Sequence, residues 1–315
     1  KLQTLIKEKA TFKTFFEQAE RIAAALVAAG IQPGDRVAVQ VEKSISAVEL
    51  YIGTILAGAV FLPLNTAYTP AEVAYFLGDA APALLVCDPD SVAALTPIAK
   101  AASVSHIRTL SSNGSGSLQE QQAAQQPGFE GVARGADDLA AILYTSGTTG
   151  RSKGAMLTHK GLASNAEVLR DYWRFTADDT LIHALPIFHV HGLFVAINTV
   201  LAAGSSMIFM RGFDATEVIR NMPQATALMG VPTFYVRLLQ QDGLTEASKN
   251  IRLFVSGSAP LLAETHKQWR EKTGHAILER YGMTETNMNT SNPYDGERRA
   301  GTVGFPLPGT EAIIT

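Results

Sequence analysis

Strand-like and helix-like segments alternate along the chain, and this alternation restricts the fold more than any other feature. The first helical segments cover residues 12–26, 47–57 and 70–77, and the first strand-like segments cover residues 36–41, 59–64 and 83–87. Apolar residues recur at three- and four-residue spacing in the former and alternate or run together in the latter. Such alternation predicts an α/β fold of layered α/β/α subdomains with largely parallel sheets.

The segment 111–135 interrupts this alternation. It is rich in Ser, Gly and Gln and has almost no large apolar residue before Phe129. We expect a solvated loop or a weak surface helix that connects two subdomains. Strand-like segments then resume at residues 140–144, 180–185, 206–210, 227–229 and 252–256.

Composition excludes several classes of protein. An apolar fraction of 46% over 315 residues is that of a globular chain, and Cys87, as the single cysteine, permits neither an internal disulfide nor a cysteine-based zinc cluster. With 26 basic and 29 acidic residues, no nucleic-acid partner is expected. No apolar run is long enough for a transmembrane helix, so no membrane partner is expected. The chain begins with Lys1 rather than Met, and we expect its numbering to begin inside a longer gene product.

A loop rich in hydroxyl side chains and glycine follows the strand-like segment 140–144 and ends in a lysine. Its candidate phosphate-binding residues are Thr145, Ser146, Gly147, Thr148, Thr149, Gly150 and Lys153. Backbone N–H groups, hydroxyls and an ammonium group suit a polyphosphate. The loop is not a Walker A motif, because Lys153 precedes a glycine rather than Ser or Thr. The alternative is a flexible surface turn.

This loop, Tyr-Thr-Ser-Gly-Thr-Thr-Gly-Arg-Ser-Lys-Gly, closely resembles the phosphate loop of the adenylate-forming enzymes, which include acyl-CoA synthetases, luciferases and nonribosomal adenylation domains. Many members have Pro where this chain has Ser152. The Arg-Ser-Lys-Gly form looks like the malonyl-CoA synthetase branch. The resemblance covers the large N-terminal domain of that branch, from about Thr11 to Thr315.

A second motif contains an aromatic residue, a glycine and a Thr-Glu pair. It comprises Glu279, Arg280, Tyr281, Gly282, Met283, Thr284 and Glu285. By itself, Thr-Glu more often starts or decorates a helix. The motif matches the family's Tyr-Gly-x-Thr-Glu motif, and this resemblance implies that Tyr281 contacts adenine, Thr284 contacts phosphate and Glu285 holds Mg²⁺. The rest of the motif is expected beside the nucleotide.

A third motif, Ser-Gly-Ser-Ala-Pro, follows an apolar strand-like segment. Small residues at such a switch allow a ligand to approach the backbone, although a helix cap is the alternative. It is not a nucleophile elbow, because Gly-x-Ser-x-Gly is absent. The resemblance implies that Gly257, Ser258 and Ala259 line the nucleotide and acyl pocket.

Two histidines follow the segment 180–185. His189 and His191 lack a third ligand nearby, which argues against a zinc site. The family has a Phe-His pair beside the acyl-adenylate, and the resemblance maps it onto Phe188 and His189. His191 is a further candidate for contact with the acyl group.

Arg237 lies within an apolar helical segment. An arginine in such a helix commonly extends to solvent. The resemblance implies instead that Arg237 holds the distal carboxylate of the substrate, for which a guanidinium is well suited.

Together the motifs imply ATP-dependent activation of malonate, and of methylmalonate in addition, to an acyl-AMP and then an acyl-CoA. The resemblance also implies Mg²⁺ as a cofactor and coenzyme A as a co-substrate. We expect a cytoplasmic enzyme. The implied catalytic residues are Lys153, His189, Thr284 and Glu285, and the implied substrate-binding residues are Arg237, His189, His191 and Ser258. The alternatives are a synthetase for another short or aromatic acid and a nucleotide-binding fragment without full catalysis.

In the resembling enzymes, a small β-barrel subdomain and a small C-terminal domain follow the large domain. We expect residues up to Thr315 to reach only the start of that barrel, with the C-terminal domain missing. The purified 315-residue chain should therefore bind ATP but form malonyl-CoA poorly in a CoA-ester assay. Robust ester formation without an added C-terminal domain would contradict this expectation.

Overall fold

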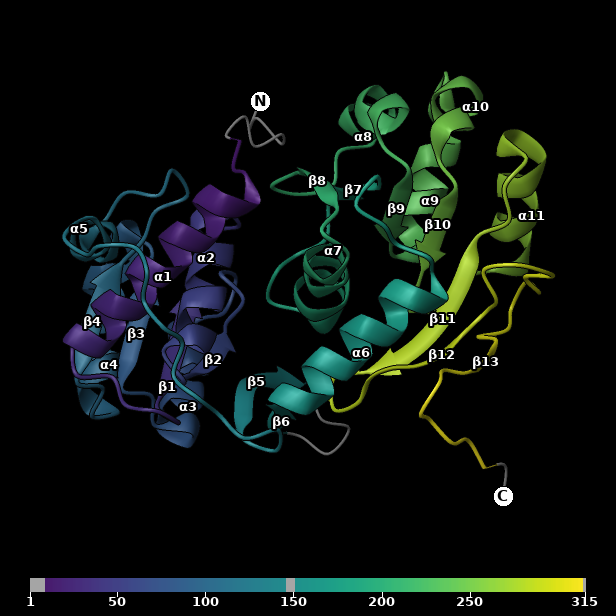
Figure 1. Cartoon of the computed structure of the whole chain (residues 1–315). Helices are drawn as coiled ribbons and strands as arrows, with labels where there is room; N and C mark the ends of the chain where they lie inside the picture. Colours follow the sequence, from purple (N-terminus) through teal and green to yellow (C-terminus); the bar gives the residue numbers. More distant parts are fainter. Residues whose placement is uncertain (1–8, 146–150, 314–315) are drawn as a thin grey trace. The chain divides into compact units, whose positions relative to one another are not determined.

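The computed structural model describes residues 9–145 and 151–313. Contacts divide the chain between Lys160 and Gly161 into two compact units. We call residues 7–160 the N-terminal unit and residues 161–315 the C-terminal unit, and describe each by itself (Figure 1).

The N-terminal unit contains a six-stranded sheet within its described residues, in the order β4-β3-β1-β2-β5-β6. Its helices are α1 (Phe12–Ala28), α2 (Ile45–Leu56), α3 (Pro70–Ala80), α4 (Val92–Ala101) and α5 (Ser117–Ala123), and its strands are β1 (Arg36–Gln40), β2 (Val60–Pro63), β3 (Leu84–Cys87), β4 (His106–Thr109), β5 (Leu139–Thr145) and β6 (Lys153–Thr158). All neighbouring strands are parallel except β5 and β6, which are antiparallel.

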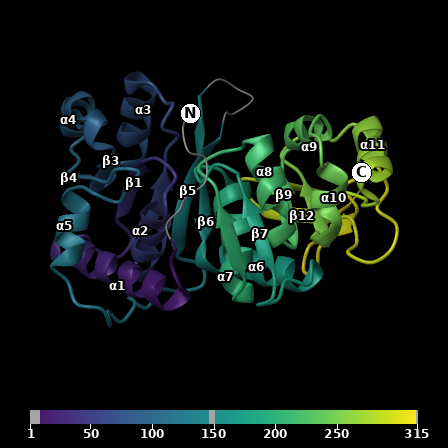
Figure 2. The ribbon, with the colours of Figure 1, turned by 90° about the horizontal axis from the view of Figure 1, so that it is seen from above.

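Helices cover both faces of this sheet. Figure 2 shows α3 and α4 on one side of β1 and β3, and α1 and α2 on the other. Phe76 and Leu77 of α3 and Leu95 of α4 pack on Leu62 and Leu85 of the strands. Because the inner parallel strands β1, β2 and β3 are buried on both faces, their sequences are mostly apolar.

The segment 111–135 lies within the N-terminal unit. It contains α5, whose Leu118 is buried. The Gln122 side-chain amide donates to the Gln18 side chain of α1 at 2.8 Å, and the Arg108 Nε donates to the Gln121 side chain at 2.7 Å. These bonds attach the segment to the N-terminal unit.

The C-terminal unit contains a seven-stranded sheet within its described residues, in the order β13-β12-β11-β10-β9-β7-β8. Its helices are α6 (His159–Tyr172, from Gly161 onward), α7 (Asn198–Ala203), α8 (Ala215–Asn221), α9 (Pro232–Leu239), α10 (Leu244–Ala247) and α11 (Ala263–Thr273), and its strands are β7 (Thr180–His183), β8 (Ser206–Phe209), β9 (Ala227–Gly230), β10 (Leu253–Ser256), β11 (Leu278–Met283), β12 (Asn287–Ser291) and β13 (Phe305–Pro306). A π-helical segment (His191–Ile197) precedes α7.

Two hydrophobic clusters lie on the two faces of this sheet. One is formed by α8 to α11 and includes Tyr235 and Trp269, whose rings meet edge to face at 4.9 Å. The other is formed by α6, the π-helical segment and α7, and includes Trp173 and Val195. The sheet is therefore an internal layer of this unit.

The predicted layered α/β fold with largely parallel sheets is confirmed. The β8, β7, β9, β10 and β11 strands pair in parallel, whereas β11, β12 and β13 pair antiparallel. After β13, residues 307–313 contain no strand. Within the described residues, none of the helices combines the length and the apolar character that crossing a membrane requires.

Two helix glycines of the N-terminal unit should respond oppositely to substitution by alanine. A Cβ at Gly53 would lie 2.7 Å from Ile22 Cγ2 and 2.8 Å from the Ala19 carbonyl oxygen, whereas a Cβ at Gly78 would meet nothing within 4 Å. Overpacking predicts that Gly53→Ala lowers the free energy of unfolding by about 1–3 kcal/mol. Gly78→Ala should raise it by about 0.5–1 kcal/mol, because alanine has less backbone freedom to lose.

Urea unfolding of the two variants measures this difference. A shift in the same direction for both would show that the close packing of α1 on α2 is not what fixes Gly53.

Candidate functional site

The carboxyl ends of parallel strands bring several predicted site residues to one edge of the C-terminal unit. Ser256 of β10 pairs with Gly230 of β9 and with Glu279 of β11, so β9 and β10 end side by side next to Glu279. Gly257 and Ser258 follow β10 directly. This edge is where open α/β sheets bind their ligands.

The guanidinium of Arg280 lies against the backbone of Gly257. An ideal Cβ on Gly257 would be 2.3 Å from Arg280 Cζ and 2.5 Å from Nε, so any larger residue there would displace the arginine. Arg280 is 4% exposed, and burial lowers its pKa to about 10. Its Nε and Nη2 have no hydrogen-bond partner among the described residues. A buried cation with free donors is costly, and a bound anion would satisfy it.

His191 lies next to this arginine. Its side chain is 3% exposed, and its Nδ1 lies 3.2 Å from Ser258 Oγ, at hydrogen-bond distance. Burial lowers its pKa well below the ordinary value, and the charge of Arg280 adds to this effect. His191 is therefore neutral near pH 7, and its Nε2 has no partner within the part of the chain that the structure describes.

The backbone around His191 is closely packed. His183 Nε2 donates to the Gly192 carbonyl at 2.8 Å, and a Cβ on Gly192 would lie 1.9 Å from the Pro186 carbonyl oxygen. Ser258 has a left-handed backbone with φ of 69°, which is uncommon for a residue with a side chain. Strained backbone of this kind is frequent at functional sites.

We call Arg280 and His191 the buried polar cluster. Ser256, the last residue of β10, is a further buried polar residue. Ser256 is 1% exposed, and its Oγ has no partner among the described residues. Tyr235 lies close by, because its hydroxyl donates to the Val255 carbonyl at 2.6 Å. The sequence did not identify Ser256 or Tyr235 as site residues. The available signal was a polar residue at the end of an apolar strand.

The carboxylate of Glu279 is engaged by other residues of the protein. Its Oε1 accepts a hydrogen bond from the Gly301 backbone N–H at 3.0 Å and lies 3.3 Å from His266 Nδ1. Because side chains alternate along a strand, Glu279 and Arg280 of β11 point to opposite sides. The structure therefore separates two side chains that the motif had grouped beside the nucleotide.

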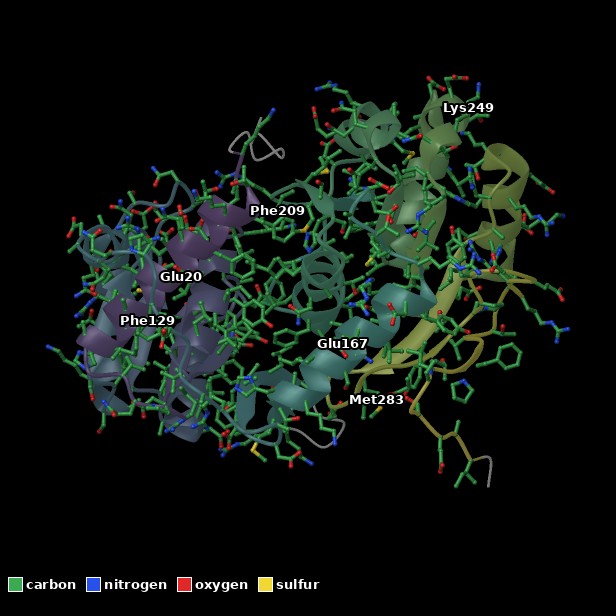
Figure 3. All side chains as sticks on the ribbon, viewed as in Figure 1. Glu20, Phe129, Glu167, Phe209, Lys249 and Met283 are labelled. Carbon is green, nitrogen blue, oxygen red and sulfur yellow. The ribbon has the colours of Figure 1, made fainter. Side chains whose placement is uncertain are left out.

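The rest of that motif lies at the end of β11 and in the following turn. Tyr281 and Met283 are 45% and 41% exposed, and Figure 3 labels Met283. A Cβ on Gly282 would lie 2.1 Å from the Asn287 carbonyl oxygen, so glycine is required for this approach of the backbone. Thr284 is half-buried and Glu285 is exposed.

Glu285 fits the role predicted for it toward Mg²⁺. The described residues contain no group of three or more His, Cys, Asp or Glu that could hold a metal by themselves. Mg²⁺ bound with a nucleotide needs only one or two protein carboxylates, because phosphate oxygens and water supply the other ligands. One exposed carboxylate is therefore sufficient.

The predicted phosphate loop belongs to the N-terminal unit. Thr145 at the end of β5 pairs with Lys153 at the start of β6, and Lys153 is exposed. The predicted phosphate contacts of residues 146–150 lie outside the described residues.

Three further predicted residues are exposed. Arg237 of α9 lies over the Phe213 ring, 4.8 Å from its centroid, and is not part of the buried polar cluster. His189 is exposed, with its ring 5.0 Å from the Phe188 ring. Ala259 is exposed beside Ser258.

Stability should depend on pH through His191. Its folded pKa lies below the unfolded value of about 6.5, so the unfolded chain binds more protons below that pH. The free energy of unfolding of the ligand-free protein should therefore fall as pH is lowered below about 6.5, by at most about 1.4 kcal/mol per pH unit from this group.

Urea unfolding of the wild type and of His191→Gln between about pH 7.5 and 5 measures the effect, since the variant should show a shallower dependence. Parallel curves would mean that His191 does not take up a proton on unfolding.

Comparison with known proteins places this geometry in context. The sequence profile described as AMP-binding enzyme matches residues 4–315. A malonate–CoA ligase of Arabidopsis thaliana is 36% identical over 307 residues, which cover 90% of this chain and 50% of that protein. The chain thus spans about half the length of the curated relatives it matches.

Solved structures of similar proteins also match most of this chain and about 60% of their own length. The ATP-bound MatB of Rhodopseudomonas palustris has a TM-score of 0.94 and 58% identity, covering 96% of this chain and 60% of its own. A malonyl-CoA ligase in a ternary product complex with methylmalonyl-CoA and AMP has a TM-score of 0.78 and 36% identity, covering 92% of this chain and 60% of its own.

Proposed function

Because the chain belongs to the AMP-binding enzyme family, we propose that it carries the ATP and acyl pocket of an ATP-dependent malonate–CoA ligase. The related malonate–CoA ligases and MatB support this proposal. Since the chain spans about half of those relatives, the activity of the whole protein is part of the proposal.

The proposed reaction has two steps. A malonate carboxylate oxygen attacks the α-phosphorus of ATP, which forms malonyl-AMP as the bond to pyrophosphate breaks. The CoA thiolate then attacks the acyl carbon, which forms the thioester and releases AMP. The protein contributes position and electrostatic stabilisation, and no protein nucleophile is required.

Named residues have separate roles in this proposal. Lys153 and the loop hydroxyls bind phosphate oxygens and stabilise the charge that builds up on them. Glu285 would hold Mg²⁺, which when bound offsets phosphate charge. Thr284 contacts phosphate, and Tyr281 with its exposed ring contacts adenine.

The observation that carries the choice of malonate is the buried polar cluster. Malonate has two carboxylates, and while one reacts, the other must remain charged and fixed. The free Nε and Nη2 donors of Arg280 match the two oxygens of a carboxylate, and the neutral His191 can donate from Nε2. We therefore assign the distal carboxylate to Arg280, which modifies the role expected for Arg237.

The same cluster supplies selectivity. Acetate and benzoate have no second carboxylate, so either acid would leave the buried guanidinium unpaired. Sites with buried polar groups reject ligands that cannot pair with them. Methylmalonate keeps both carboxylates and adds one methyl group, so we include it among the substrates.

Calorimetric titration in the presence of α,β-methylene ATP, which cannot transfer its adenylyl group to the acid, tests the proposal. The wild type should bind malonate and methylmalonate much more tightly than acetate or benzoate. Arg280→Gln should weaken malonate binding about 100-fold, because it removes a buried charged donor. Arg237→Ala, at an exposed position, should change it less than about three-fold.

Several results would contradict the proposal. Strong loss in Arg237→Ala with little change in Arg280→Gln would return the anchor to Arg237. Equal binding of benzoate would favour the synthetase for another acid. A thermal unfolding midpoint for each variant separates loss of binding from loss of the fold.

A further inference from the structure

Helix α3 of the N-terminal unit contacts both ends of the predicted phosphate loop. The Tyr144 hydroxyl, just before the loop, donates to Asp79 Oδ2 at 2.6 Å. The Tyr75 hydroxyl donates to the Ser152 carbonyl, at the other end of the loop, at 2.7 Å. The Arg151 guanidinium lies over the Tyr75 ring, 5.6 Å from its centroid. Neither Tyr75 nor Asp79 was identified from the sequence.

The two ends are also packed on the same helix. The Tyr144 ring lies 4.4 Å from the Phe76 ring and 6.2 Å from the Tyr75 ring. Tyr144 pairs with Gly154 across β5 and β6, and a Cβ on Gly154 would lie 3.5 Å from the Tyr144 ring. The contacts of α3 therefore reach Ser152 directly and Gly154 through Tyr144, and these are the two neighbours of Lys153.

α3 itself is firmly anchored. It begins with a capping box in which Thr69 and Glu72 bond each other's backbone N–H groups. Val73, Phe76 and Leu77 are buried in the core beside the sheet. Tyr75 and Asp79 are four residues apart, so they lie on one face of the helix.

We propose that Tyr75 and Asp79 are positioning residues for nucleotide binding, acting through the loop ends. They hold Thr145 and Lys153 in place before the polyphosphate arrives. Groups fixed in advance lower the ordering cost of binding and raise affinity. This inference rests on the proposed use of ATP but concerns residues that need not touch the nucleotide.

Ring-retaining variants provide the test. Tyr75→Phe and Tyr144→Phe each remove one hydroxyl and leave the aromatic packing intact. Tyr68→Phe is the matched control, because the Tyr68 ring packs on Phe76 at 4.9 Å but, among the described residues, bonds to neither loop end. Calorimetry with MgATP and with AMP on the 315-residue chain gives the affinities, and thermal unfolding monitors the fold.

Tyr75→Phe and Tyr144→Phe should each weaken ATP binding about three- to ten-fold, in line with the loss of one hydrogen bond. AMP binding should change less, because AMP lacks the β- and γ-phosphates. Tyr68→Phe should leave both affinities unchanged.

Equal ATP affinity in all three variants and the wild type would overturn the inference while leaving the proposed function intact. An equal loss of ATP and AMP binding that follows a lower unfolding midpoint would also overturn it, because it would show a structural role alone. Failure of the wild type to bind ATP would overturn the proposed function itself and this inference with it.

Discussion

The parallel pairing of β9, β10 and β11 is the constraint on which the C-terminal site depends. Ser256 of β10 pairs with Glu279 of β11, so the next residues along the two parallel strands, Gly257 and Arg280, are placed side by side by the backbone alone. Because Gly257 has no side chain, the guanidinium of Arg280 can lie against its backbone. His191 then approaches through its contact with Ser258. The polar cluster is thus a consequence of strand order and one glycine.

This arrangement has an energetic consequence that connects the fold to its chemistry. Burial lowers the pKa of Arg280 to about 10, which still leaves the guanidinium charged near neutral pH. A buried charge whose donors are unpaired reduces stability until an anion pairs with it. Under the proposed function, the same cost would favour a dianionic acid such as malonate over a monocarboxylate. In the N-terminal unit, by contrast, α3 bonds Tyr144 and Ser152, and Ser152 is the neighbour of the exposed Lys153.

Most of the fold was predictable because its signals are local. Apolar runs identified β7, β9 and β10. The strands β4, β6, β11, β12 and β13 were missed because none of them has a long run of large apolar residues. The site was predictable only in part. Glu279 and Arg280 belong to one sequence motif, but side chains alternate along β11, so the two point to opposite sides of the sheet. The burial of Arg280 depends on strands and loops that are far apart in the sequence. Similarly, helical periodicity does not show that Arg237 lies exposed over Phe213.

The central claim is that Arg280 anchors the carboxylate of malonate that does not react. A crystal structure of the chain with malonate and α,β-methylene ATP tests it most directly. The account predicts that one carboxylate lies at hydrogen-bond distance, about 2.7–3.2 Å, from both Nε and Nη2 of Arg280. Malonate held by Arg237, with the Arg280 donors bonded to the nucleotide or left unpaired, would contradict it.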